Sequence, residues 1–181
     1  MRAFPSILGL VVSIGAGLLA GCSTADKTPD VTGGIRDSLK RSGFKDVSVA
    51  QDRDKGVVTL KGSVASDAGK AQAESIAKSI AAGQVVANEI AVLPPGAEGI
   101  TKTVNSDLDD GIKKNLDAAL VARRLDHGVK YDVKNGVVTL TGTVLSPSRR
   151  ASVESAAAAV PNVRQVVDTI DVKNQKATST P

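Results

Sequence analysis

Gly136-Val-Val-Thr-Leu-Thr-Gly-Thr-Val144 is the stretch that decides the fold, because a near-copy, Gly56-Val-Val-Thr-Leu-Lys-Gly-Ser-Val64, stands 80 positions earlier. Successive side chains of a strand point to opposite faces, and this alternation places Val58 and Leu60 on one face of the first copy. A Lys-Gly or Asn-Gly pair opens each copy, and glycine adopts the positive φ of a hairpin turn at little cost. Each copy is therefore predicted to be the second strand of a hairpin.

The elements around the two copies follow in the same order. Apolar residues at every fourth position predict a first helix, around 31–39 in one half and 108–116 in the other. A short strand leads into each hairpin turn, a helix with a serine N-cap follows each motif strand, and a third strand closes each half. This order predicts an α+β fold with two tandem α-β-β-α-β units. Each unit should hold a three-stranded mixed sheet with two helices on one face, and its last strand should run parallel to the motif strand.

These patterns divide the chain into six segments. We expect a lipoprotein signal peptide over 1–21, a tether over 22–30, a first unit over 31–93, a Pro- and Gly-rich linker over 94–105, a second unit over 106–173 and a disordered tail over 174–181. Units of this size are marginally stable alone, so we expect the two to pack against each other through their sheets or helices.

Four residues interrupt the apolar rows of the predicted strands. Gly62 and Gly142 indicate close packing of a helix on the motif strand, or a bulge. Asn88 and Asp168 fall on the apolar row of the last strand, where a side chain that caps a turn or satisfies a strand edge is expected rather than catalysis.

The amino terminus has the pattern of a secretory signal. Arg2 is followed by an apolar run over 7–20, which is too short for a permanent membrane span. The run ends in Leu19-Ala20-Gly21-Cys22, which resembles a bacterial lipobox, the motif in which the cysteine is lipidated and becomes the first residue. A plain signal peptide with an incidental cysteine is the alternative. Ser23 stands where an aspartate would resemble an inner-membrane signal, so we expect attachment to the outer membrane, facing the periplasm.

Composition argues against several classes of function. Removing Arg2 from the 23 basic residues leaves 22 against 19 acidic residues, and this balance does not indicate a nucleic-acid partner. Cys22 is the only cysteine and His127 the only histidine, so neither an internal disulfide nor a metal site is expected. No constellation of acid, base and nucleophile stands out. We therefore expect a protein that is not an enzyme and that has no cofactor.

Taken together, the motifs resemble the BON domain. The residues that carry the resemblance are Gly56, Leu60, Gly62, Val64, Val86, Asn88, Ile90 and Val92 in the first unit, and Gly136, Leu140, Gly142, Val144, Val166, Asp168, Ile170 and Val172 in the second. A lipobox followed by two such units is similar to the dual-BON outer-membrane lipoproteins, and a soluble osmotic-stress protein is the other dual-BON relative. The resemblance implies a role in envelope maintenance and, for the lipoprotein branch, binding of anionic phospholipid through the second unit.

Three basic pairs in the second unit are the candidate lipid-binding residues: Lys113 and Lys114, Arg123 and Arg124, and Arg149 and Arg150. Each cation near an anionic membrane contributes on the order of 1 kcal/mol. A solvated surface is the alternative, because acidic and basic residues are equally numerous over 106–172. The lipoprotein branch has an interfacial tryptophan in the first helix of the second unit, and this chain has no tryptophan. Leu120, Val121 or Leu125 would have to serve as apolar insertions.

We expect from these observations a lipid-anchored periplasmic protein that supports outer-membrane integrity. Its partner would be an anionic phospholipid membrane, bound through the second unit. The alternative is a protein-interaction scaffold without lipid binding, which would hold an envelope protein along its sheet edges or in the groove between the units.

Replacement of the predicted lipidated cysteine tests the anchor. In a bacterial host, Cys22→Ser should leave an uncleaved precursor or release the protein from the membrane fraction, because serine has no thiol to acylate. Immunoblots of membrane and soluble fractions measure both effects, with Ser23→Ala as the matched control. A Cys22→Ser protein that fractionates and migrates like the wild type would contradict the lipobox prediction.

Overall fold

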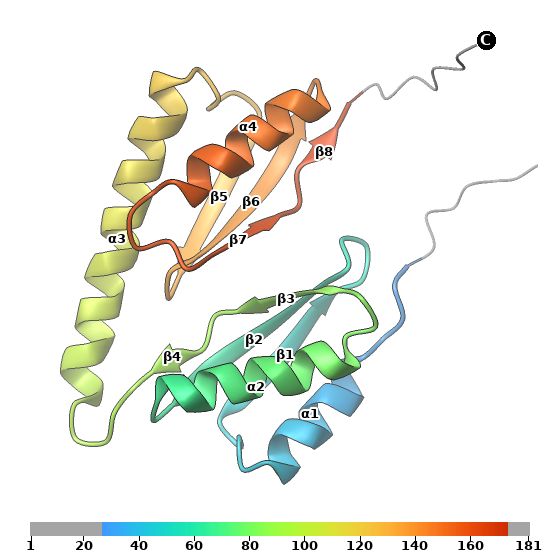
Figure 1. Ribbon diagram of the computed structural model, residues 1–181, viewed down its shortest axis with the longest axis vertical. Coiled ribbons are helices and arrows are strands. Elements are labelled where there is room, and N and C mark those ends of the chain that lie inside the picture. The colour runs from blue at the N-terminus through green and yellow to red at the C-terminus, as the bar shows by residue number, and fades with distance from the viewer. Residues whose placement is uncertain (1–26, 174–181) are drawn as a thin grey trace, which may run out of the picture.

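The computed structural model describes residues 27–173, which form two α-β-β-α-β units (Figure 1). The first unit contains α1 (Thr32–Arg41), β1 (Val47–Asp52), β2 (Val57–Val64), α2 (Asp67–Ile80), β3 (Val85–Asn88) and β4 (Ala91–Val92). The second contains α3 (Glu98–Ala122), β5 (Val129–Lys134), β6 (Val137–Val144), α4 (Pro147–Ala158), β7 (Gln165–Asp168) and β8 (Asp171–Val172). The predicted fold class is confirmed. The predicted signal peptide, Cys22 and the predicted tail over 174–181 lie outside the described residues.

In each unit the motif strand is the centre of a mixed sheet. β2 pairs antiparallel with β1 and parallel with both β3 and β4, and β6 pairs in the same way with β5, β7 and β8. The predicted parallel relation between the motif strand and the last strand is therefore confirmed. The last strand is interrupted in both units, so four strand segments occupy three positions in the sheet.

Asn88 and Asp168 stand at these interruptions. The Oδ1 atom of Asn88 accepts a hydrogen bond from the backbone N of Ile90 at 3.3 Å, and Oδ1 of Asp168 accepts one from the backbone N of Ile170 at 2.9 Å. Asparagine and aspartate side chains can form a hydrogen bond with the backbone two residues later in the chain, and this bond replaces one hydrogen bond between neighbouring strands. Both residues thus have the turn-capping role expected from the sequence.

Each unit buries its own aliphatic core between one sheet face and its two helices (Figure 1). The side chains with no exposed surface include Ile35, Leu39, Val58, Leu60 and Ile90 in the first unit, and Leu116, Val138, Leu140 and Val153 in the second. Leu60 and Leu140 occupy the same place in the two motif strands, opposite Val49 and Tyr131 respectively. The helices cover only this face, so the other face of each sheet needs a different partner.

Gly62 and Gly142 mark a close approach between backbones. Their φ angles are +122° and +119°, a region that favours glycine. A Cβ at Gly62 would lie 2.0 Å from the Asp46 carbonyl oxygen, and one at Gly142 would lie 2.2 Å from that of Gly128. The neighbour is thus the chain entering β1 or β5, and the prediction that a helix packs on these glycines is wrong.

The two sheets meet through the faces that carry no helices. Val57 and Ala87 of the first unit and Val137 and Val167 of the second form a buried cluster of their own. Val57 is equivalent to Val137, and Ala87 is equivalent to Val167, so the cluster contains the same two positions of both units. The contact therefore has an approximate twofold symmetry. The expectation that the units pack together is confirmed, and the sheets make this contact.

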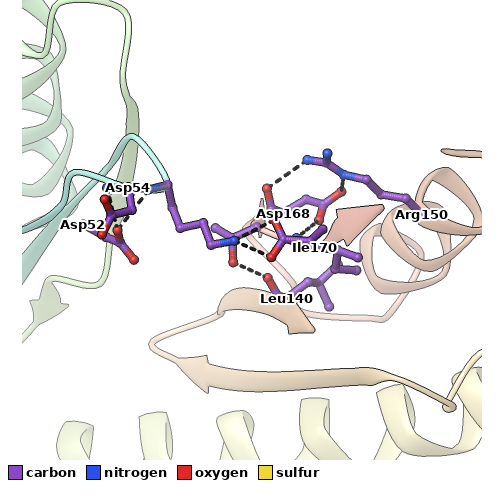
Figure 2. A network of polar contacts seen from close by, with 9 residues as sticks. Asp52, Asp54, Leu140, Arg150, Asp168 and Ile170 are labelled. Atoms are coloured by element: carbon purple, nitrogen blue, oxygen red, sulfur yellow. Dashed lines mark hydrogen bonds and ion pairs between the residues drawn. The ribbon is translucent and has the colours of Figure 1, made fainter. Parts of the chain in front are cut away.

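The hairpin turns add polar contacts at both ends of this cluster. Lys55 Nζ lies 2.7 Å from a carboxylate oxygen of Asp171, an ion pair that joins the first hairpin to the second unit in Figure 2. At the other end, Asn135 Nδ2 donates to the backbone oxygen of Glu89 at 2.7 Å. Burial raises the pKa of the Glu89 carboxyl group, and Lys61, at 3.7 Å, opposes that shift.

The side chain of Gln165, in β7, links this strand to the neighbouring strand β3 of the first unit. Its side-chain Nε2 donates to the backbone oxygen of Val86 at 2.7 Å, and its Oε1 accepts from the backbone N of Asn88 at 3.1 Å. A side-chain amide can satisfy a backbone donor and acceptor at once, so this residue occupies the edge of β3 in place of a further strand.

Two segments that the sequence predicted as connections have more structure than expected. α3 begins at Glu98, so residues 98–105 belong to a helix and only 93–97 connect the units. Residues 98–105 form helical turns that α1 does not have, and the side of these turns that faces the protein lies beside β4. This packing outweighs the weak helix propensity of the segment. The end of the predicted tether is held against the first hairpin, because Thr28 N donates to the Arg53 oxygen at 3.0 Å and Arg53 Nε donates back to the Thr28 oxygen at 2.7 Å.

The repeat predicts equal effects from truncating the two core leucines. Leu60→Ala and Leu140→Ala should each lower the free energy of unfolding by roughly 2–5 kcal/mol, since both side chains are fully buried. Urea denaturation followed by circular dichroism measures the change. The exposed Thr141→Ala is the control and should stay within about 0.5 kcal/mol of the wild type. A loss below about 1 kcal/mol in either leucine variant would contradict a shared core position.

Candidate functional site

The six basic residues singled out in the sequence do not share one surface. The structure divides them into Arg150, which is paired with Asp168, Lys113 and Lys114 in the middle of α3, and a group of three at one end of the second unit. The hypothesis of a single basic face is therefore replaced by a smaller cluster, and lipid binding itself stays a prediction.

Arg150 points to the last strand of its own unit. Its Nε donates to Oδ2 of Asp168 at 2.8 Å, and its Nη2 donates to the Asp168 backbone oxygen at 3.3 Å. Figure 2 shows the Arg150 side chain turned towards Asp168. The Asp168 side chain is 8% exposed, so this pair neutralises a nearly buried carboxylate. Arg150 is a structural residue in this arrangement.

Lys113 and Lys114 are distant from the other basic residues. Lys113 lies nearly three helical turns before Arg123, or about 15 Å along the axis at 1.5 Å per residue. Its Nζ lies 3.3 Å from a carboxylate oxygen of Asp110, while Lys114 is exposed on the outer side of α3. Both are solvated charges of a mixed helix surface.

Arg123, Arg124 and Arg149 lie together at the junction of two helices. α3 ends at Ala122, and the Nη2 atom of Arg149 donates to the backbone oxygen of Arg124 at 2.9 Å. Arg149 is held near the start of α4 because its backbone N donates to the N-cap hydroxyl of Ser146 at 3.2 Å. The α3 terminus and the α4 start are thereby fixed at the same end of the second unit.

Two exposed apolar side chains belong to this end. Val121 is 62% exposed and Leu145 is 75% exposed. Leu120 and Leu125 are only 2% and 8% exposed and belong to the core, so the prediction that either could insert into a membrane is wrong. We call Val121, Arg123, Arg124, Leu145 and Arg149 the basic tip.

Leu145 was missed by the sequence reasoning, although a signal was present. It precedes the N-cap Ser146, and an apolar residue there usually packs on another at the fourth helical position. That position is Arg150, which is engaged with Asp168, so Leu145 has no such partner in its own helix. Ala65 holds the equivalent place in the first unit, so the large apolar side chain is particular to the second.

Arg124 has a strained backbone. α3 ends with hydrogen bonds from Leu125 N to the Leu120 oxygen and from Arg124 N to the Val121 oxygen, which place Arg124 in a left-handed conformation with φ of 56°. The same ending of α1 uses Gly43, with φ of 90°. A left-handed conformation costs a residue with a side chain about 1 kcal/mol or more. Strain of this kind is typical of positions with a functional constraint.

Tyr131 fixes α3, which carries the tip, to its sheet. Its hydroxyl donates to Oδ1 of Asp117. Burial, followed by this hydrogen bond and the nearby carboxylate charge, raises the pKa of Tyr131 to about 12. The protonated hydroxyl links β5 to α3 through this hydrogen bond.

The loop after the tip holds the only histidine of the chain. His127 is 86% exposed, and its Nδ1 lies 3.3 Å from Oδ1 of Asp126. Among residues 27–173 there is no group of three His, Cys, Asp or Glu side chains that could hold a metal ion. None of the helices in the same range is long and apolar enough to cross a bilayer.

Comparison with known proteins identifies the family. Two stretches, 28–94 and 108–174, each match the family model described as the BON domain. The chain belongs to the BON-domain family. Members of this family have envelope and membrane-related roles, and it is not a family of enzymes. The two matched stretches correspond to the two α-β-β-α-β units.

Two solved structures that match the chain come from a secretion system. One is the C-terminal domain of CdsD, the structural protein of the Type III secretion system of Chlamydia trachomatis, with 15% identity and a TM-score of 0.33 over 80% of this chain and 66% of that chain. A second CdsD structure has 15% identity and a TM-score of 0.32 over 78% of this chain and 61% of that chain. The BON chain spans less than two thirds of the length of each, and a likeness at this level carries no functional argument. No curated protein matches the chain significantly in sequence.

The strain at Arg124 leads to a direct prediction. Arg124→Gly should raise the free energy of unfolding by about 1 kcal/mol, because glycine adopts the left-handed conformation without a Cβ clash. Arg123→Gly, whose φ is −97°, is the control and should not stabilise the protein. Thermal and urea unfolding measure both variants. Equal stability changes in the two would contradict a strained Arg124.

Proposed function

We propose that this BON protein is a lipid-anchored protein of the outer membrane, facing the periplasm, whose second unit binds anionic phospholipid through the basic tip and so supports membrane integrity. The observation that carries the proposal is the tip itself. Three arginines and two exposed apolar side chains lie at the same end of the second unit, and one of the arginines occupies a strained position where the first unit has glycine. Arginine binds phosphate oxygens, and an exposed valine and leucine can enter the headgroup region.

The geometry of the predicted anchor supports this orientation. Lys27 stands five positions after Cys22, and an extended chain of that length spans at most about 18 Å. Thr28 is bonded to Arg53 in the first hairpin turn, and Lys55 of the same turn is paired with Asp171. Asp171 lies opposite Thr143, two residues before Leu145. A lipid on Cys22 would therefore hold the tip end of the second unit near the membrane.

The end of the first unit that corresponds to the basic tip lies at the opposite end of the molecule. The twofold contact between the sheets makes the C-terminal ends of α1 and α3 point to opposite ends of the molecule (Figure 1). An anchor beside the first hairpin thus favours the second unit over the first for membrane contact. This explains, in physical terms, how two similar units would take different roles.

Vesicle co-sedimentation tests the tip. The chain from Ser23 onward, which keeps both units and lacks the anchor, should bind phosphatidylglycerol vesicles and not phosphatidylcholine vesicles. Binding should weaken with salt, because the Debye length falls from about 10 Å at 0.1 M to about 3 Å at 1 M. Replacing Arg123, Arg124 and Arg149 together by Ser should reduce affinity by about a hundredfold, at about 1 kcal/mol per cation.

A matched variant separates the tip from net charge. Lys40, Arg41 and Lys45 are exposed at the equivalent end of the first unit, and their replacement by Ser removes the same charge. This control should bind nearly as well as the wild type. Equal losses of vesicle affinity in the two triple variants, or binding that persists in 1 M salt, would contradict membrane binding through the basic tip. The scaffold alternative would then be favoured, with the exposed Ile100, Val104 and Leu108 along α3 as its surface.

A further inference from the structure

The N-terminal half of α3 exposes an apolar stripe along one side of the helix. Ile100 is 75% exposed, Val104 48% and Leu108 41%. On a helix with 3.6 residues per turn, residues at these spacings lie within about 40° of Val104. The side that packs on the protein is a different one, because it carries the buried residues Asp109 and Ile112. Single apolar side chains are common on a protein surface, but a contiguous row of them indicates an interaction site.

Two small residues continue the stripe at its ends. Ala97, the N-cap residue of α3, comes three positions before Ile100, and Gly111 comes three positions after Leu108. Glycine inside a helix lowers the stability of the helix relative to alanine. No close contact explains this glycine, because a Cβ at Gly111 would meet nothing within 4 Å outside its own stretch of helix. The open space above it leaves room for the backbone of another helix.

The stripe has the same pattern in both directions along the helix. Its spacings are 3, 4, 4 and 3 residues, and its side chains are small, large, intermediate, large and small in the order Ala97, Ile100, Val104, Leu108 and Gly111. A twofold interface requires such a pattern, because residue i of one copy contacts residue j of the other and j contacts i. An antiparallel pair centred on Val104 sets Ile100 against Leu108, and it sets Ala97 against Gly111. Spacings of three and four residues also fit two helices that cross at a small angle.

We propose that this face of α3 pairs with the same face of a second copy of the chain, in an antiparallel and twofold-symmetric helix pair centred on Val104. The symmetric pattern favours a second copy over an unrelated protein, which would not need it. Electrostatics permit the pairing, because no charged residue of α3 lies within about 40° of Val104 around this half of the helix. The nearest one, Asp107, faces Thr101 of the second copy, so like charges are not opposed.

The proposed pairing does not rest on membrane binding. Leu108 lies 14 residues before Ala122, where α3 ends, so the stripe is about 21 Å from the basic tip at 1.5 Å per residue. None of the tip residues belongs to the stripe. The chain with Arg123, Arg124 and Arg149 replaced by Ser should therefore pair like the wild type, and failure of either proposal leaves the other testable.

Disulfide cross-linking tests the register of the pair. The chain from Ser23 onward has no cysteine, because Cys22 is the only one. Val104→Cys should cross-link to its own copy under mild oxidation, since the two Cα atoms face each other across the twofold axis. Ile100→Cys should not, because its two copies would lie about 12 Å apart along the axis, and bridged Cα atoms lie within about 7 Å of each other. A chain with both Ile100→Cys and Leu108→Cys should cross-link, and non-reducing electrophoresis measures all three.

Sedimentation velocity measures the pairing without cross-links. The chain from Ser23 onward should shift from monomer to dimer as its concentration rises. Val104→Asp should weaken the dimer roughly a hundredfold, because it sets two carboxylates against each other on the axis. Ser106→Asp, which is exposed on the other side of the same helix, is the matched control and should leave the dimer unchanged.

A charge pair distinguishes antiparallel from parallel pairing. Ile100→Glu or Leu108→Lys alone should weaken the dimer, since each sets a charge against an apolar side chain. The two together in one chain should restore it, because antiparallel pairing brings the opposite charges together. A parallel pair would instead set like charges against each other.

Circular dichroism and thermal unfolding check that each variant is folded. A chain that stays monomeric at the highest attainable concentration and gives no Val104→Cys dimer would overturn the proposal. Equal cross-linking of Ile100→Cys and Val104→Cys, or a folded Val104→Asp that dimerises like the wild type, would also overturn it. A monomeric wild type whose vesicle binding is lost in Val104→Asp would assign the stripe to the membrane and not to a second copy.

Discussion

The contact between the two helix-free sheet faces is the constraint on which the rest of the structure depends. Each unit has helices on one side only, so Val57 and Val137 would face water in separate units. Burying them against Ala87 and Val167 removes apolar surface from water, the main favourable term for small domains. The polar contacts of Gln165 lie beside the same cluster, so the tandem arrangement satisfies both apolar groups and strand edges.

The symmetry of this contact creates a functional difference between two similar units. A twofold relation turns the equivalent ends of the units away from each other, and the chain enters beside the first hairpin. Only one end can then lie next to an anchor. Two differences in sequence between the units fall at that end, where Arg124 stands in place of the glycine of the first unit and Leu145 in place of its alanine. This end of the second unit has a strained backbone and exposed large apolar side chains, and the equivalent end of the first unit has neither.

The extended first helix of the second unit provides a second feature that no single unit has. α3 has 25 residues against 10 in α1, and its added turns lie beside β4 of the first unit. Asp109, in the middle of this helix, holds the second hairpin turn, which in turn reaches Glu89 of the first unit. Residues of the helix, the turn and the connection line an open cavity of about 350 Å³ between the units, so its shape depends on the same contacts that fix the units.

The sequence alone determined the repeated α-β-β-α-β order, the parallel last strand and the core role of Leu60 and Leu140. These features follow from the periodicities of strands and helices, which are local properties of the chain and are kept in the folded structure. It also identified six basic residues, but it could not separate Arg150, bound to Asp168, from Arg149, held at the tip. Only the tertiary structure decided which faces meet, where α3 begins and which side chains of its last turns are buried. Those outcomes depend on distances between segments far apart in the chain, and a pattern within one segment carries no information about them.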